Sequence, residues 1–153
     1  MTTAIHVMRE ADVGAAVAMY GEANQFATAE AIEGWTRKNR ALFPQYHLVF
    51  ANRVRVLGAI SGTLEGDTGI IEDLAAHASA RRHGIGSSLL AELLKKFKED
   101  GVKRVQLWVH KKSVAVLPFY EKHGFKILRT ERTKCVPDVP DGEEITILEK
   151  VLF

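Results

Sequence analysis

The hydrophobic positions in the first part of the chain predict one strand followed by two helices. Residues 4–10 alternate apolar and polar side chains, as in a short strand, and residues 13–20 then carry apolar side chains at helical spacing. Residues 30–40 repeat that helical spacing after Thr28, which is suited to cap a helix, and Pro44 follows them. The chain therefore begins with a strand and two amphipathic helices.

The pattern then changes to strands, and later to strands that alternate with helices. Three runs at residues 46–51, 54–64 and 68–76 are separated by short turns, which predicts an antiparallel meander. The elements expected after them are a helix over 85–97, a strand over 102–109, a helix over 114–122, and strands over 125–130 and 144–151. A strand, helix and strand in succession favour parallel neighbours joined by a right-handed crossover. A mixed sheet with helices follows.

Composition narrows the classes of protein without naming a function. The chain has 153 residues, 46% of them hydrophobic, and a net charge of +2, so we expect one globular domain over residues 1–153. The near-neutral balance argues against a nucleic-acid binder, and no apolar run is long enough to span a membrane. The first nine residues lack a secretory pattern and Cys135 is the single cysteine, so we expect a cytoplasmic protein.

The segment with the clearest chemical signal is residues 71–90, which reads as a strand, a basic loop and a helix. Gly84 and Gly86 remove side chains where the backbone must approach a ligand, and the first amides of a helix have no partner within it. Such amides bind anions, and a phosphate or pyrophosphate would fit. The loop and first turn add charged and hydroxyl side chains from Arg81, Arg82, His83, Ser87 and Ser88.

Two known glycine motifs of nucleotide-binding proteins do not match the residues around Gly84 and Gly86. A Rossmann fingerprint would place a third glycine at Leu89, and a P-loop would require a Gly-Lys-Ser/Thr run that is absent. The arrangement Arg81-x-x-Gly84-x-Gly86 instead resembles the acyl-CoA-binding motif of the GNAT superfamily of N-acetyltransferases. A second segment, Phe119-Tyr120-x-x-x-Gly124-Phe125, resembles the family's next helix, in family order and separation.

This resemblance implies a fold. It predicts an α/β protein of the α+β type, with a mixed, mostly antiparallel sheet of about seven strands. Two central parallel strands would be splayed, and about four helices would flank the sheet. The resemblance is strong over residues 70–127 and elsewhere rests on the order of strands and helices.

The resemblance also implies how acetyl-CoA, the expected cosubstrate, would be held. Amides of the loop and helix start would bind the pyrophosphate, which assigns cofactor contacts to Arg81, Arg82, His83, Gly84, Ile85, Gly86 and Ser87. The strand residues Leu74, Ala75 and Ala76 would pair with the pantetheine arm through their backbone. Many family members carry Asn where Ser113 stands, so the contact of Ser113 to that arm rests on one hydroxyl.

Two residues are expected to handle protons. Tyr120 is the candidate general acid for the departing thiolate, although Phe119, Tyr120 and Phe125 would also serve as core packing. Glu72 is the leading candidate base, because a Glu-Asp pair at this place resembles diamine acetyltransferases of the superfamily. Strand alternation puts Glu72 on the side of Leu74 and opposite Asp73. Asp73, His110 and a water chain remain alternatives.

The sequence therefore predicts an enzyme that transfers an acetyl group from acetyl-CoA directly to a primary amine. The acids Glu65, Asp67, Glu72 and Asp73 favour a small cationic amine, and a peptide amine is the other option. An acyl-CoA-binding module without catalysis is the alternative function. A covalent route through Cys135 is disfavoured because no base lies beside it in sequence, and no histidine pair has metal-ligand spacing. The oligomeric state is open, with a homodimer among the options.

Overall fold

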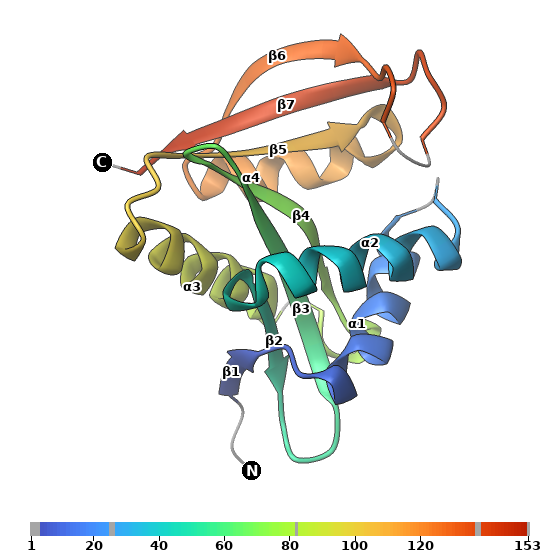
Figure 1. Cartoon of the computed structure of the whole chain (residues 1–153), viewed down its shortest axis with the longest axis vertical. Helices are drawn as coiled ribbons and strands as arrows, with labels where there is room; N and C mark the ends of the chain where they lie inside the picture. Colours follow the sequence, from blue (N-terminus) through green and yellow to red (C-terminus); the bar gives the residue numbers. More distant parts are fainter. Residues whose placement is uncertain (1–3, 25–26, 82, 137–138, 153) are drawn as a thin grey trace.

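The computed structural model describes residues 4–24, 27–81, 83–136 and 139–152. A seven-stranded mixed sheet and four α-helices make up these residues (Figure 1). The strands are β1 (Ala4–Val7), β2 (His47–Ala51), β3 (Val56–Glu65), β4 (Thr68–Ala76), β5 (Arg104–His110), β6 (Lys126–Arg132) and β7 (Glu144–Val151). The α-helices are α1 (Glu10–Ala23), α2 (Ala29–Leu42), α3 (Ile85–Glu99) and α4 (Leu117–Lys122). The predicted fold class is confirmed.

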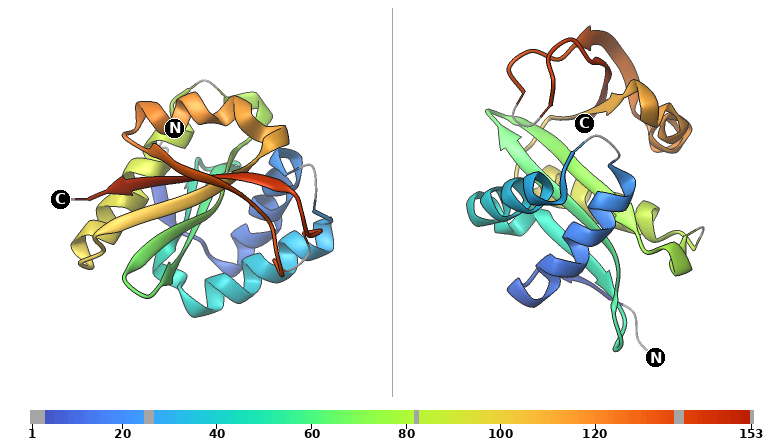
Figure 2. Two further views of the ribbon diagram at one scale, coloured as in Figure 1. Left: turned by 90° about the horizontal axis from the view of Figure 1, so that it is seen from above. Right: turned by 90° about the vertical axis from the view of Figure 1, so that its right-hand side faces the viewer.

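Helices cover both faces of the sheet. The strand order is β1-β2-β3-β4-β5-β7-β6, and α1 and α2 contact one face of β3 while α3 contacts the other (Figures 1 and 2). The short α4 joins the α3 side, because its Tyr120 belongs to the same buried cluster as the leucines of α3. A 3-10 segment, Lys111–Val116, precedes α4, so the helix predicted over 114–122 is shorter than expected.

The parallel pair β4 and β5 holds together at one end only. Residues 68–70 of β4 pair with residues 104–106 of β5, and no further parallel pairing follows. β4 then runs on beside β3, while β5 follows β7, so the two strands diverge (Figure 1). This divergence opens the sheet at its centre and confirms the predicted splay.

A bulge in β4 corrects the expected orientation of Glu72. Ser61 pairs with Asp73 and Gly62 with Ile71, which leaves Glu72 as an extra residue in the ladder. A bulge interrupts the alternation of side chains. Glu72 and Asp73 both face α2, and Leu74 faces α3 instead. The alternation argument was wrong at this point because it assumed a regular strand.

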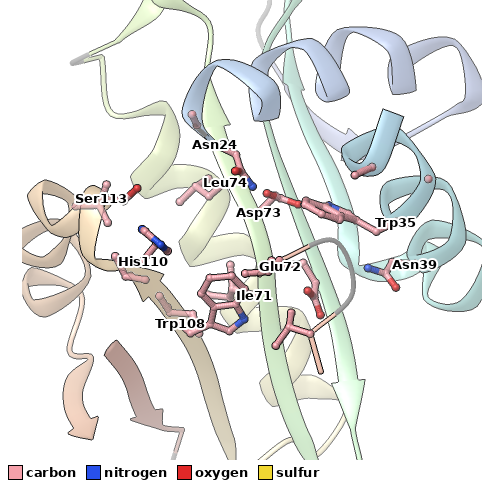
Figure 3. Close-up of a pocket in the computed structure, with 18 of the residues that line it drawn as sticks. Asn24, Trp35, Asn39, Ile71, Glu72, Asp73, Leu74, Trp108, His110 and Ser113 are labelled. Carbon is pink, nitrogen blue, oxygen red and sulfur yellow. The ribbon is translucent and has the colours of Figure 1, made fainter. Parts of the chain in front are cut away.

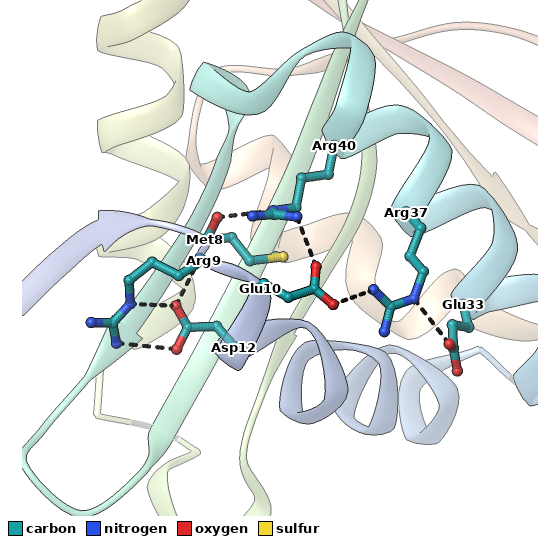
Figure 4. Close-up of polar contacts among 7 residues, drawn as sticks. All are labelled: Met8, Arg9, Glu10, Asp12, Glu33, Arg37 and Arg40. Atoms are coloured by element: carbon teal, nitrogen blue, oxygen red, sulfur yellow. Dashed lines mark hydrogen bonds and ion pairs between the residues drawn. The ribbon is translucent and has the colours of Figure 1, made fainter.

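Ion pairs at the start of α1 hold α2 in place. Glu10 accepts hydrogen bonds from Arg37 at 2.7 Å and from Arg40 at 3.3 Å, and Arg40 also donates to the carbonyl of Met8 at 3.0 Å (Figure 4). These contacts are largely exposed, so each one stabilises the fold little. Their effect is geometric, since they link the helix that carries Trp35 to the beginning of α1.

A buried leucine of α3 allows a direct test of the fold. Leu93 is fully buried between α3 and the sheet. We expect Leu93→Ala to lower the free energy of unfolding by about 3 kcal/mol, because a buried cavity adds to the lost apolar transfer energy. Urea denaturation measures this change. The exposed Lys95 on the same helix provides the control, since Lys95→Ala should change stability by less than about 0.5 kcal/mol.

Candidate active site

A cleft of about 830 Å³ occupies the opening between β4 and β5. Figure 3 shows side chains from α2, β4 and β5 that point into it. The lining residues that bear on the chemistry are Asn24, Glu30, Trp35, Lys38, Asn39, Glu72, Asp73, Leu74, Trp108, His110, Ser113, Tyr120, Val136 and Val139. The divergence of the two parallel strands therefore creates a space lined by both acidic and aromatic groups.

Two neighbouring carboxylates, Glu72 and Asp73, lie on the wall formed by β4. Glu72 accepts a hydrogen bond from Thr63 Oγ1 at 2.8 Å, and Asp73 accepts one from Trp35 Nε1 at 2.9 Å. Burial raises the pKa of Asp73 to about 7, and the charge of Glu72 adds to this while the Trp35 hydrogen bond opposes it. Burial also raises the pKa of Glu72, partly offset by Thr63. The pair is suited to exchange a proton near neutral pH.

A buried polar contact lies behind Asp73. Ser61 stands directly opposite Asp73 in the ladder between β3 and β4, and its hydroxyl hydrogen-bonds that of Tyr20 at 2.8 Å. Burial raises the pKa of Tyr20 well above its usual range, and the charge of Asp73 contributes. The carboxylate of Asp73 is thus held by the Trp35 indole, and a neutral hydroxyl pair lies near it.

Tyr120 reaches the cleft from α4, on the far side from α2. Its ring packs edge-on against Phe119 and Phe125, at centroid distances of 5.1 and 5.7 Å, and only 8% of the residue is exposed. Burial raises the pKa of Tyr120 above its ordinary value, and the charge of Asp73 adds to the shift. The phenol therefore keeps its proton at neutral pH, as a general acid requires.

A second hollow of about 320 Å³ lies where α3 begins. Gly84 caps the helix in the left-handed conformation, with φ +75°, and the first amides of α3 follow it. The residues around this hollow are Ala76, Ala80, Arg81, Gly84, Ile85, Gly86, Ser87, Phe119 and Lys122. Amides without helical partners and two cationic side chains suit a phosphate group, and an added Cβ at Gly86 would lie 3.5 Å from Phe119, which also lines the hollow.

Comparisons with known proteins agree with this geometry. A sequence profile described as "Acetyltransferase (GNAT) family" matches residues 4–125. The chain belongs to the GNAT acetyltransferase family. An acetyltransferase of Pectobacterium atrosepticum is 29% identical over 93 residues, which cover 61% of this chain and 62% of that protein. The matches to curated relatives span less than two thirds of each relative's length.

Solved structures of other GNAT proteins share the whole fold. Ard1 of Thermoplasma volcanium superposes with a TM-score of 0.84 at 18% identity, covering 100% of this chain and 99% of that one. The PaiA N-acetyltransferase of Thermoplasma acidophilum, solved in complex with coenzyme A, gives a TM-score of 0.72 at 22% identity and covers 99% of both chains. Identities this low establish the common fold only.

The residues predicted for CoA binding in this GNAT acetyltransferase divide between the two cavities. Leu74 and Ser113 line the cleft, whereas the second hollow takes in Ala76, Arg81, Gly84, Ile85, Gly86 and Ser87. The Ala75 side chain packs with α1, which leaves its backbone for any contact. His83 is exposed and does not line the hollow, and Arg82 lies outside the described residues.

His110, one of the alternative bases, is hydrogen-bonded at one ring nitrogen and lies near a carboxylate at the other. Nδ1 accepts a hydrogen bond from the backbone of Lys112 at 3.1 Å, and Nε2 lies 3.6 Å from Glu143 Oε1. The ring is buried at the end of β5 and caps the 3-10 segment that follows. These contacts favour a positioning role for His110 and leave Glu72 and Asp73 as the stronger candidates.

The sequence patterns gave several residues at the site no functional role. Trp108, Phe119 and Lys122 line the cavities, and His123 hydrogen-bonds Ser87 at 3.0 Å. Phe119 and Lys122 flank the predicted acid in sequence, so the family motif could have indicated them. Trp108 carried no such signal, because an aromatic residue in a strand is usually core.

The described residues contain no group of three or more His, Cys, Asp and Glu side chains placed to hold a metal ion. Within the same residues, no helix combines the length and apolar character that crossing a membrane requires.

The raised pKa of Asp73 predicts that this candidate base destabilises the fold as the pH rises. Between pH 4 and 7 the folded chain keeps a proton on Asp73 that the unfolded chain has released, so this group's contribution to stability falls as pH rises. We expect Asp73→Asn to raise the melting temperature at pH 8 by about a few degrees, with less gain at pH 4. Calorimetric melts at both pH values measure this. A lower melting temperature at pH 8 would contradict the assigned pKa.

Proposed function

We propose that this GNAT acetyltransferase uses acetyl-CoA and transfers the acetyl group to the nitrogen of a primary amine by direct attack. The observation that carries the proposal is that neighbouring residues of β4 and of α4 line the two cavities, and that one of these cavities holds a proton-handling pair. The hollow at the start of α3 suits the pyrophosphate, and Leu74 and Ser113 line the cleft that leads to Tyr120. The carboxylates Glu72 and Asp73 lie in that same cleft.

Proton transfer assigns the residues their roles. An alkylammonium with a pKa near 10.4 must lose a proton before it attacks, which costs about 4 kcal/mol at pH 7.4. Glu72 and Asp73 accept that proton directly or through water, and the amine nitrogen then forms a bond to the acetyl carbon. As the carbon-sulfur bond breaks, Tyr120 donates its proton to the thiolate, and the second proton that the nitrogen loses as the amide forms restores the phenol, directly or through water. The products are the amide and coenzyme A.

A direct reaction fits the placement of the cysteine. Cys135 is the chain's single cysteine, and it is not one of the described residues that line the cleft. Its backbone N–H donates to Asp141 in the connection between β6 and β7. This placement supports a direct reaction, in which the amine and the thioester meet in one ternary complex. A cytoplasmic location and a homodimer remain proposals beside this one.

The experiment combines binding and turnover. Calorimetric titration of the full chain with coenzyme A should give a measurable heat, and thiol release from acetyl-CoA should depend on an added primary amine. Amide formation is confirmed by mass spectrometry. Tight CoA binding without acetylation of any amine or peptide would instead support the module without catalysis, and no CoA binding would overturn both functions.

A further inference from the structure

Two indoles face the same half of the cleft from different elements. On β5, Val105, Leu107 and Val109 pack into the core on the α3 side, so strand alternation turns Trp108 toward the side of α2. Trp35 lies on α2 and lines that half as well. Figure 3 shows Trp108 on the β5 side and Trp35 on the α2 side, with the carboxylates of β4 between them.

The Trp35 indole has a fixed orientation. Its Nε1 donates to Asp73 at 2.9 Å, and part of the ring packs against the cluster beneath α1 and α2. The residue is half-buried, so the rest of the ring forms the cleft wall. A ring held in this way presents an apolar surface beside a carboxylate without losing further side-chain entropy on binding.

Apolar side chains from a third part of the chain add to the lining. Val136 and Val139 line the cleft from the connection between β6 and β7. Thr133 anchors this connection, since its hydroxyl donates to the carbonyl of Pro140 at 2.6 Å and accepts from the amide of Glu143 at 3.0 Å. The acceptor half of the cleft therefore offers the apolar surfaces of two indoles and two valines beside the acidic pair, with polar side chains of α2 completing the lining.

The charges in the lining match a single cation. Among the described residues of the lining, Glu72 and Asp73 are the adjacent pair of carboxylates, and α2 adds Glu30 and Lys38, which together contribute no net charge. Burial and mutual repulsion keep the adjacent pair from holding two full negative charges near pH 7. Glu65 and Asp67, at the turn between β3 and β4, do not line the cleft.

From this arrangement we infer that the acceptor is a primary amine with one positive charge and an aromatic or large apolar body. Its ammonium lies at Glu72 and Asp73, and its body lies between Trp35 and Trp108. The inference rests on the proposed N-acetyl transfer and narrows its acceptor. It disfavours polyamines, because the described residues of the lining hold one pair of adjacent carboxylates and α2 adds no net negative charge for a second ammonium.

The test compares amines that share the ammonium and differ in the body. With the full chain and acetyl-CoA, kcat/KM should fall in the order 2-phenylethylamine, hexylamine, propylamine. The aromatic amine should exceed both propylamine and spermidine by at least about tenfold, the size expected from apolar and ring contacts. A rate for spermidine or for a short peptide above that for 2-phenylethylamine would overturn the inference.

Variants of Trp108 test the wall directly. Trp108→Leu should raise KM for 2-phenylethylamine about tenfold, with little change for propylamine, since propylamine has no ring to lose contact. Trp108→Phe keeps an aromatic face and should recover most of the loss. CoA affinity, measured by calorimetry, should match that of the unaltered chain in both variants. Equal effects on both amines would show that Trp108 only supports the fold.

A binding measurement separates this inference from the proposed function. Calorimetric titration of the CoA-saturated chain with 2-phenylethylamine should show binding that Trp108→Leu weakens, whether or not transfer occurs. Binding without turnover of any amine would support the amine pocket and count against acetyl transfer. Turnover of spermidine in preference to aromatic amines would support N-acetyl transfer and reject the pocket as described.

Discussion

We expect Tyr120→Phe to lower kcat by about 100-fold and to leave the affinity for coenzyme A unchanged, because general acid catalysis typically contributes a factor of that size or more. The substitution keeps the ring, which packs against Phe119 and Phe125, and removes only the hydroxyl. Thiol release at saturating amine measures kcat, and calorimetry measures CoA binding. An unchanged kcat would remove Tyr120 from the proposed mechanism.

Tyr46 supplies the matched control for this substitution. It is another buried tyrosine, whose hydroxyl donates to Asp100 at the end of α3, away from both cavities. Tyr46→Phe should reduce stability, by about 1 to 3 kcal/mol for a hydrogen bond to a charged group, and leave kcat intact. Comparison of the two variants separates loss of a buried hydroxyl from loss of the proton donor.

The second large effect is expected at Gly84. The residue has a φ of +75°, which strains any side chain and especially a β-branched one, and it positions the amides that open α3. We expect Gly84→Val to weaken coenzyme A binding by at least about tenfold, since even one lost hydrogen bond to a charged phosphate is worth that much. Calorimetric titration gives the dissociation constant.

Gly101 provides a control that separates the effect of backbone strain from the loss of coenzyme A binding. It follows α3 at the other end, with a φ of +81°, and an added Cβ would meet nothing within 4 Å at either glycine. Gly101→Val should therefore lower the melting temperature about as much as Gly84→Val does, and it should leave the affinity for coenzyme A unchanged. If both variants bound coenzyme A equally well, the start of α3 would not be the phosphate site.

The order of elements was accessible from the sequence because it depends on local periodicity. The leucines of α3 recur at helical spacing, and the turns between β2, β3 and β4 carry their usual residues, so these boundaries differ from the structure by a few residues at most. The boundary of α4 was less accurate. Ser113, with φ −114° and ψ 20°, interrupts the helical turn that precedes α4, and no residue type in the sequence predicted this interruption.

The side to which Glu72 points could not be predicted, because a bulge depends on how two strands pair. The sequence of residues 71–73 does not show that one of them lacks a pairing partner in β3. The pairing of β4 with Ser61 and Gly62 determines this. The same holds for Trp35 and Trp108. They are 73 positions apart in the sequence, and only the packing of α2 over the sheet and the divergence of β5 bring them to one cleft.

The sequence by itself determined the family, the element order and the glycine-started helix at which an anion would bind, since each depends on short stretches of neighbouring residues. The tertiary structure alone decided which side chains meet. It turned Glu72 and Asp73 to the same side and set Asp73 against Trp35, where burial and the charge of Glu72 raise the pKa of Asp73, and it separated Glu65 and Asp67 from the cleft. Such proximities arise from long-range strand pairing and helix packing, which local patterns do not encode.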